Sequence, residues 1–305
     1  MMNFKEFTIN VWKGIRKKAD GIFHVSVIES VKNNGTRLTG ISAVPRKSSG
    51  GPCVYLDGYY REYEGGNMEL PEIVDEVYSR MIRHQDDLLD VNMAEFLHWD
   101  TARGHIYVKL VNTEKNKEQL KTVPHRTFLD LSAVYYLAVN GMMQDRDIGT
   151  ALIQSQHMSL WKQKEEKLYE AAAHNMRSDG SPVFEDMGAV FRQLVPESTG
   201  HWGMERISSD MGMYILTNRR KHYGASEILD QNTLREISDK MKGDFIVLPS
   251  SVHEVIVLDA KNGMKYKDLA SIVQDVNASE VSAEEFLSDH VYVYNRRTES
   301  LNMAV

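Results

Sequence analysis

The stretch Phe245-Ile-Val-Leu-Pro-Ser-Ser-Val-His-Glu-Val-Ile-Val-Leu258 is the most informative part of this chain. Two apolar, largely β-branched runs enclose a short polar insert. This pattern predicts a pair of buried strands, or one long strand with an irregular middle. Pro249 has no N–H to donate to a sheet, so it predicts a bulge, an edge or a turn between the two runs.

The composition is that of an ordinary globular protein. The 305 residues are 42% hydrophobic and 26% charged, and they carry a net charge of −7. A chain of this length can bury a sizeable core divided over two or three subdomains. The acidic balance disfavours a globally basic nucleic-acid binder. Cys53 is the one cysteine, which excludes an internal disulfide and a cysteine-rich zinc site and fits a reducing compartment.

The sequence shows no targeting or membrane-spanning segment. Its first residues are amphipathic and charged, unlike the basic and then apolar start of a signal peptide. No apolar run approaches the ~18 residues that a membrane helix needs. We therefore expect a soluble, cytoplasmic protein.

Three regions follow one another along the chain. Residues 1–85 predict an α-β-β-β-α module, with an Asn34-Gly35 hairpin signal between its first two strands. Residues 86–210 predict a middle α/β region, with an irregular loop over 177–212. Residues 211–305 predict a C-terminal α/β region. The fold class expected is α+β, with mixed or antiparallel sheets flanked by helices.

Within the two later regions, the pattern predicts elements at specific ranges. Helices are expected to about residue 98 and over 113–121, 155–176, 184–194, 225–241 (one or two, broken near Asp230) and 265–276. Strands are expected over 105–111, 147–154, 213–216 and 291–294, and a long apolar run covers 128–139. A boundary between subdomains is expected near 205–212.

The polar insert supplies the residue types of a serine hydrolase. Ser250 or Ser251 could act as nucleophile, His253 as base, and Asp289 as the group that orients the base. No Gly-x-Ser-x-Gly elbow surrounds these serines. The alternative is structural: the serines satisfy backbone groups in a turn, and His253 is hydrogen-bonded within the sheet. We favour this alternative.

Two other sites could be formed from the same region and its neighbours. His253, Glu254, Asp289 and His290 offer nitrogen and oxygen ligands for a metal, but no His-Glu-x-x-His spacing accompanies them, and we expect no metal and no cofactor. The segment from Thr217 to Gly224 follows a strand and precedes a helix, where an anion could bind. Its candidate ligand-binding residues are Asn218, Arg219, Arg220, Lys221 and Tyr223, although a solvated loop is the simpler interpretation.

Several short motifs resemble a known family. They are Lys32-Asn-Asn-Gly-Thr-Arg-Leu-Thr-Gly40, Val54-Tyr-Leu-Asp57 with Tyr59-Tyr60, Phe128-Leu-Asp-Leu131, Leu216-Thr-Asn218 with Tyr223-Gly224-Ala225, Leu248-Pro-Ser-Ser-Val-His-Glu254 and Leu287-Ser-Asp-His-Val-Tyr292. Together they resemble a domain-of-unknown-function family of gut clostridial bacteria that is frequent on integrative and conjugative elements. A second uncharacterised Firmicutes family is distantly similar. The resemblance implies a bacterial cytoplasmic protein carried by a mobile element, and it implies no activity and no catalytic residue.

These observations favour a binding protein over an enzyme. We expect a protein partner, in keeping with a mobile-element protein that modulates a host defence or regulatory factor. Two alternatives stay open. One is a hydrolase directed at a small molecule or nucleotide, using Ser250, Ser251, His253 and Glu254. The other is a nucleic-acid contact through Arg219, Arg220 and Lys221. The sequence leaves the oligomeric state open.

Overall fold

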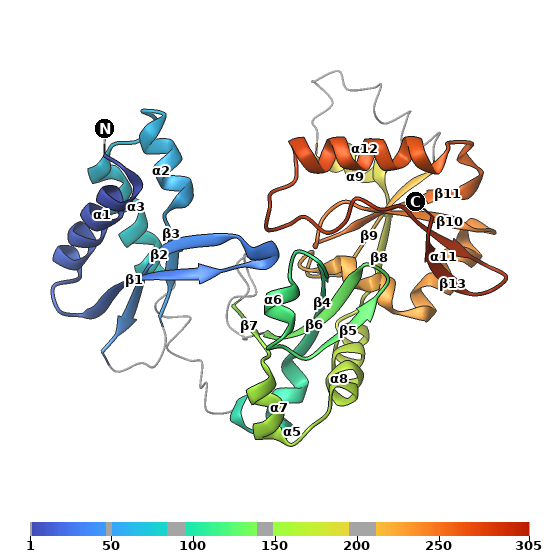
Figure 1. The fold of residues 1–305 in the computed structure, drawn as a ribbon, viewed down its shortest axis with the longest axis horizontal. Coiled ribbons are helices and arrows are strands. Elements are labelled where there is room, and N and C mark those ends of the chain that lie inside the picture. The colour runs from blue at the N-terminus through green and yellow to red at the C-terminus, as the bar shows by residue number, and fades with distance from the viewer. Residues whose placement is uncertain (1, 47–50, 84–95, 139–148, 195–211, 305) are drawn as a thin grey trace. The chain divides into compact units, whose positions relative to one another are not determined.

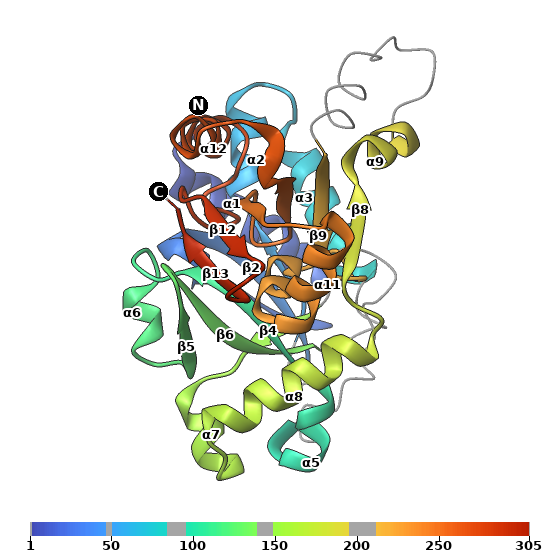
Figure 2. The same cartoon turned by 90° about the vertical axis from the view of Figure 1, so that its right-hand side faces the viewer.

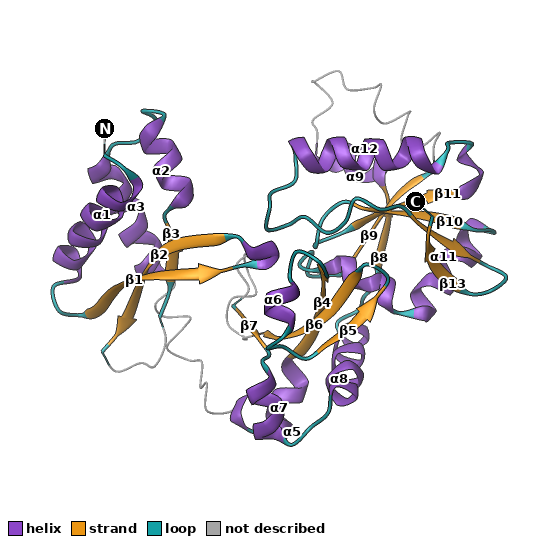
Figure 3. Ribbon diagram, in the orientation of Figure 1, coloured by secondary structure: helices purple, strands orange, loops and turns teal. Residues whose placement is uncertain are grey.

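The chain folds into two compact units of α+β architecture, as Figures 1 and 3 show. The structure, a computed structural model, describes residues 2–46, 51–83, 96–138, 149–194 and 212–304. The N-terminal unit comprises residues 1–94 and 139–148, and the C-terminal unit comprises residues 95–138 and 149–305. Every strand pair in the described residues is antiparallel. The predicted fold class is therefore confirmed.

The N-terminal unit is built on a sheet of strand order β1-β2-β3. Its strands are β1 (Phe23–Val31), β2 (Arg37–Pro45) and β3 (Cys53–Tyr55). The predicted hairpin is present: β1 and β2 pair over nine residues, and a 3₁₀ turn (Asn33–Gly35) with Asn34 in the left-handed region joins them. Asn and Gly accept this conformation at low cost, so the dipeptide sets the hairpin.

Helices cover one face of this sheet. They are α1 (Phe4–Ala19), α2 (Asp57–Glu64) and α3 (Leu70–Arg83). Asn3 and Glu6 form a capping box that starts α1. The predicted α-β-β-β-α elements are all present, and the tyrosine-rich segment adds α2. The buried core joins helices and strands through Phe7, Val11, Ile15, Ala19, Phe23, Ile41, Ala43, Leu56, Ile73, Val74, Val77 and Met81.

The C-terminal unit begins with a sheet centred on one fully buried strand. That strand, β6 (Leu131–Ala138), pairs with β4 (Ile106–Asn112) on one side. On its other side it pairs with β5 (His125–Phe128) and β7 (Thr150–Leu152). Because β6 is buried on both faces, its sequence is a largely apolar run in which Ser132 is the polar residue. The short helices α5 (Trp99–Ala102), η3 (Arg103–His105) and α6 (Lys117–Leu120) flank this sheet.

Two helices follow where one was predicted over 155–176. They are α7 (Ser155–Trp161) and α8 (Glu165–Ser178). Lys162 adopts the left-handed conformation (φ 54°, ψ 39°) and ends α7. Apolar periodicity alone did not reveal this break, because Lys is not a residue that signals a left-handed cap. Figure 2 shows α8 lying alongside the sheet that contains β4 and β6.

A second sheet in the same unit has the strand order β13-β12-β10-β11-β9-β8 in the described residues. The predicted strand pair is confirmed, because Phe245 to Pro249 of β10 pair with Asp259 to Val255 of β11. The strands are β8 (Val183–Asp186), β9 (Met213–Thr217), β10 (Phe245–Pro249), β11 (Val255–Asp259), β12 (Tyr292–Asn295) and β13 (Ser300–Met303).

Helices pack on this second sheet and complete the unit. Helix α12 (Tyr266–Ser279) buries Leu269 and Val273 against Ile246, Leu248 and Leu258. The segment after β9 forms a 3₁₀ helix, η5 (Gly224–Leu229), and then α11 (Gln231–Met241), as the predicted break near Asp230 required. The remaining helices are α9 (Met187–Leu194) and the 3₁₀ helix η6 (Ala260–Asn262).

The structure also differs from the sequence interpretation elsewhere. The region predicted as irregular, 177–212, contains the unexpected strand β8, while α9 falls on the helix expected over 184–194, and residues 195–211 lie outside the described part. Strands β8 and β9, on either side of the boundary expected near 205–212, pair in one sheet of one unit. Strand β13 was not expected, because its run Ser300-Leu-Asn-Met303 has little apolar character. The helix expected from 86 to 98 falls largely on residues that are not described.

No helix in the described part of the chain is both long and apolar enough to cross a membrane.

Candidate functional site

The end of β9, the start of η5 and the β10–β11 turn meet at Gly224. A Cβ on Gly224 would lie 2.2 Å from Thr217 Oγ1, 2.5 Å from the Asn218 nitrogen and 2.7 Å from the His253 carbonyl oxygen. Only glycine fits so close an approach of backbone segments. The Thr217 hydroxyl donates a hydrogen bond of 2.8 Å to the same His253 carbonyl. This junction places the predicted insert beside the predicted anion-binding segment.

The imidazole of His253 forms contacts within this junction and does not face a serine nucleophile. Its Nδ1 accepts a 3.1 Å hydrogen bond from the Tyr223 N–H, and its Nε2 lies 3.7 Å from Glu285 Oε1. Tyr223 and His253 rings are stacked, with centroids 5.5 Å apart. The Ser251 hydroxyl accepts a hydrogen bond from the His253 backbone N–H at 3.0 Å. Ser250, Ser251, His253 and Glu254 thus form the partly buried turn between β10 and β11.

Asp289 and His290 belong to a different cluster. The Asp289 carboxylate accepts a 2.8 Å hydrogen bond from the Asn277 amide of α12. His290 Nδ1 lies 3.0 Å from Asp130 Oδ2. The Ser288 hydroxyl donates to the same Asp130 oxygen at 2.7 Å, and the Tyr292 hydroxyl donates to Asp130 Oδ1 at 2.7 Å. Asp130 stands in the turn between β5 and β6, so this cluster joins the two sheets of the unit.

Ser288, His290 and Asp130 have the residue types of a catalytic triad without its geometry. The Ser288 hydroxyl is 3.2 Å from Nδ1 of His290, the same nitrogen that faces Asp130. A triad needs serine and carboxylate on opposite imidazole nitrogens. Ser288 is also fully buried, so no substrate reaches it. The cluster is a structural hydrogen-bond network, and burial beside Asp130 raises the pKa of the Tyr292 hydroxyl.

The predicted anion-binding segment is largely occupied by interactions within the protein. Arg220 forms a 2.5 Å ion pair with Asp179 and also donates to the Tyr107 hydroxyl. Burial raises the pKa of Tyr107 to about 12, despite the nearby Arg220. The Asn218 side chain closes the loop by donating to the His222 carbonyl and accepting from the His222 N–H.

The other residues of this segment have separate surroundings. Arg219 and Lys221 are exposed. The Lys109 ammonium lies 4.4 Å from the ring centroid of Tyr223. His222 is held against the rings of Tyr223 and His253, and burial, followed by the nearby His253, lowers its pKa to about 4. The segment is therefore an aromatic and cationic layer packed between β4 and the β10–β11 turn, rather than an open anion cradle.

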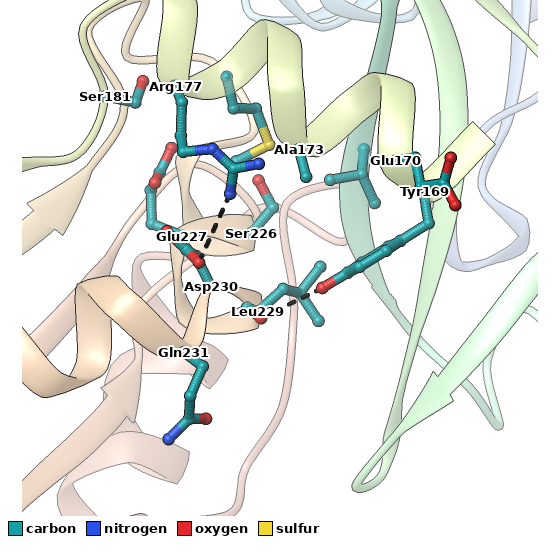
Figure 4. A pocket seen from close by; sticks show the side chains of 12 residues that line it. Tyr169, Glu170, Ala173, Arg177, Ser181, Ser226, Glu227, Leu229, Asp230 and Gln231 are labelled. Carbon is teal, nitrogen blue, oxygen red and sulfur yellow. Dashed lines mark hydrogen bonds and ion pairs between the residues drawn. The ribbon is translucent and has the colours of Figure 1, made fainter. Parts of the chain in front are cut away.

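A cavity of about 380 Å³ lies next to this layer, between α8 and η5 (Figure 4). Arg177 of α8 reaches toward Asp230 across it, at 3.9 Å, and the Tyr169 hydroxyl donates to the Leu229 carbonyl at 3.3 Å. Its wall includes Glu227, which is only 2% exposed. Among the described residues, the lining is formed by Val108, Tyr169, Glu170, Ala173, Met176, Arg177, Ser181, Ser226, Glu227, Leu229, Asp230 and Gln231.

Glu227 is the residue that sequence reasoning missed. Burial raises the pKa of its carboxyl to about 8. A hydrogen bond with Ser181 lowers this pKa, and the negative charge of Asp230 raises it. A strongly shifted carboxyl in a cavity is typical of a functional site. The only signal in the sequence was one acidic residue inside the run Gly224-Ala-Ser-Glu-Ile-Leu229, which is a weak one.

Metal ligands do not gather in the described part of the chain. No group of three or more His, Cys, Asp or Glu side chains is placed there to hold a metal ion. His253 and Glu254 lie in the β10–β11 turn, whereas Asp289 is held by α12 and His290 by Asp130.

Comparison with known families assigns the chain to a group. The family of unknown function DUF5688 matches residues 4–296, nearly the whole chain. The chain belongs to this family. No curated protein and no solved structure matches it significantly. DUF5688 carries no described activity, so the chemistry of this member must be inferred from its own residues.

Proposed function

We propose that this DUF5688 member is a non-catalytic binding protein that recognises a protein partner. The proposal rests on the observation that the predicted catalytic side chains form hydrogen bonds that hold the fold together. His253 accepts from the Tyr223 backbone, Ser251 accepts from the His253 backbone, and His290 lies against Asp130. A nucleophile must instead face its base and an accessible reacting atom.

Strand β1 supports a protein as the partner. Among the described strands it pairs with β2 alone, so its other edge has no strand partner, although the Val25 carbonyl of β1 accepts a 3.1 Å hydrogen bond from the Trp12 indole N–H. Val27 and Val31 are both exposed on it. Natural proteins usually protect such an edge, and an unprotected edge can accept a further strand from a partner.

Affinity purification with edge variants tests the proposal. The tagged full-length protein is expressed in its native host and crosslinked, and the proteins recovered are quantified by mass spectrometry. The double variant Val27→Lys/Val31→Lys adds charge to the edge, and Ile272→Lys is its control, since Ile272 is an exposed apolar residue of α12. We expect one protein to be enriched with wild type and control, and lost with the double variant. Recovery of no specific protein, or equal recovery with all three, contradicts the proposal.

The two alternatives make different demands. A hydrolase that used the β10–β11 turn would lose all activity in Ser251→Ala and His253→Ala variants. A nucleic-acid contact would depend on Arg219 and Lys221, since Arg220 is neutralised by Asp179, and its affinity would fall as salt rises. Neither follows from the geometry as directly as binding does.

We further propose a bacterial, cytoplasmic protein carried by a mobile element, in which setting a host defence or regulatory factor is the partner. Cys53 fits a reducing compartment, because it is the single cysteine and burial raises the pKa of its thiol, which keeps it protonated. Fractionation of the native host, with detection of the chain in the cytosolic or the membrane pellet fraction, checks the location.

A further inference from the structure

The cavity beside Glu227 has the size and composition of a small-molecule site. Its volume of about 380 Å³ is in the range of ligand pockets. Val108, Ala173, Met176 and Leu229 supply apolar surface, and the Tyr169 ring supplies an aromatic wall. Polar groups gather where η5 meets the start of α11. Such a division between an apolar body and a polar end selects an amphipathic molecule.

One carboxyl oxygen of Glu227 is unsatisfied in this wall, although Ser181 is a hydrogen-bond neighbour of the group. In the described part of the protein its Oε1 is buried without a hydrogen-bond partner. A buried polar atom left unpaired is unfavourable, so native structures usually pair it. The neighbouring Asp230 is satisfied, because its carboxylate accepts from the Asn232 N–H and the Thr233 hydroxyl and faces Arg177. Glu227 is therefore the acceptor that a ligand would complete.

The charge of the lining sets the sign of the ligand. Its acidic residues are Glu170, Glu227 and Asp230 and its basic residue is Arg177, while Glu170 is ion-paired at 2.5 Å with Lys167 outside the lining. Arg177 already faces Asp230. A ligand carboxylate would find no unpaired cation in this lining, whereas a cationic donor would reach Oε1 of Glu227, the acidic side chain of the described lining that lacks an ion-pair partner.

We propose that this cavity binds a small primary amine, whose ammonium group donates hydrogen bonds to the Glu227 carboxylate while its apolar body lies against Tyr169, Met176 and Leu229. This proposal does not depend on the proposed binding of a protein partner at the β1 edge. In the empty cavity the raised pKa of Glu227 keeps the carboxyl protonated at neutral pH. Binding of an ammonium ion ionises the carboxyl, so the Glu227 proton leaves to solvent as the ion pair forms.

Isothermal titration calorimetry of the full chain with benzylamine, and with the neutral benzyl alcohol as matched ligand, tests the site. Measurements in two buffers of different ionisation enthalpy count the protons released. We expect benzylamine to bind with release of about one proton at pH 7. Its affinity should rise between pH 6 and 8 by up to about tenfold per pH unit. Benzyl alcohol should bind more weakly and release no proton.

Two variants and a control separate this site from unspecific binding. Glu227→Gln has the shape of the protonated acid, and we expect it to lower benzylamine affinity at least about tenfold and to abolish proton release. Ala173→Phe fills the cavity, keeps Glu227 and should also abolish binding. Glu166→Gln, at an exposed position of α8 outside the lining, should leave binding unchanged. Unaltered binding by Glu227→Gln, equal binding of the alcohol, or no amine binding at about 10 mM ligand overturns the proposal.

Discussion

Asp130 shows how a single carboxylate can hold distant segments together. It lies in the β5–β6 turn and accepts hydrogen bonds from Ser288 and Tyr292, and it also faces His290. These partners stand about 160 residues further along the chain, with sequence separations of 158, 160 and 162. A serine, a histidine and an aspartate in one cluster therefore serve stability here, because the serine is buried and both partners face one imidazole nitrogen.

Asp130→Asn should destabilise the protein by about 2–4 kcal/mol, because an amide nitrogen cannot accept the hydrogen bonds that the carboxylate receives. Urea denaturation followed by fluorescence measures the change. Asp100→Asn is the control, since the Asp100 side chain is 91% exposed, and it should change stability by less than about 0.5 kcal/mol. Similar effects of the two substitutions would refute the role given to Asp130.

Glu227 should make stability depend on pH in a specific direction. Its folded-state pKa of about 8 lies above the ordinary value of 4.5, so the folded state keeps a proton that the unfolded state releases. Stability is therefore lost as pH rises from about 4.5 to 8, by up to about 1.4 kcal/mol per pH unit. Glu227→Gln removes this proton, whereas the charged neighbours Asp230, Arg177 and Glu170 are common to both proteins and cancel in the comparison.

Urea denaturation of wild type and Glu227→Gln at pH 5.5 and 7.5 measures this effect. We expect the wild type to lose about 1–3 kcal/mol more than the variant between the two values. Parallel pH profiles would show that the Glu227 carboxyl is ionised in the folded protein.

At the scale of the element, η5 is positioned by close backbone contact rather than by apolar periodicity. Gly224 starts it against Thr217 and the His253 carbonyl, and Tyr223 precedes it in the left-handed conformation (φ 57°). Helix η5 then carries Glu227 into the cavity wall and ends at Asp230, the N-cap of α11. The junction thus links the predicted β10–β11 turn to the cavity, which explains why the two sites are neighbours.

Gly224→Ala should destabilise the protein by about 1–3 kcal/mol, because the added Cβ collides with backbone that must move. Gly104→Ala is the matched control. Nothing lies within 4 Å of a Cβ at Gly104, so alanine there should stabilise the protein by about 0.4–1 kcal/mol. Thermal or urea unfolding of both variants provides the comparison. Equal and small changes in stability for the two variants would show that the backbone at the β9–η5 junction shifts to accept a Cβ without loss of stability.

At the scale of the whole molecule, the two units have separate cores. In the described residues, the buried core of the N-terminal unit is formed by side chains between Phe7 and Met81. In the C-terminal unit, α12 packs on the second sheet through its own buried cluster, which includes Ile246 and Val273. A protein built in this way can lose one core without losing the other.

Ile73→Ala, in the core of the N-terminal unit, should lower the stability of that unit by about 2–5 kcal/mol. Hydrogen exchange with mass spectrometry should show lost protection in α1 and α3 and unchanged protection in β6 and β10. Ile246→Ala should give the opposite pattern, since Ile246 is a buried residue of β10. Equal loss of protection throughout the chain in either variant would indicate a single cooperative unit.

The sequence by itself determined the elements whose pattern is local. The two β-branched runs around the insert predicted β10 and β11, the Asn34-Gly35 pair predicted the hairpin, and the break near Asp230 predicted the start of α11. These signals act over a few residues, where backbone preference and apolar periodicity decide the conformation. The α+β class follows from the predicted helices and strands taken together.

Only the tertiary structure decided the chemical role of each polar residue. His253 became an acceptor for the Tyr223 backbone, Arg220 a partner of Asp179, and Glu227 a buried acid beside a cavity. Partners and burial come from segments far apart in the chain, and the pKa of a carboxyl depends on that surrounding rather than on its neighbours in sequence. The sequence therefore pointed to the 248–254 insert as the candidate site. The tertiary structure instead points to Glu227, whose carboxyl is buried in a cavity wall and has a raised pKa.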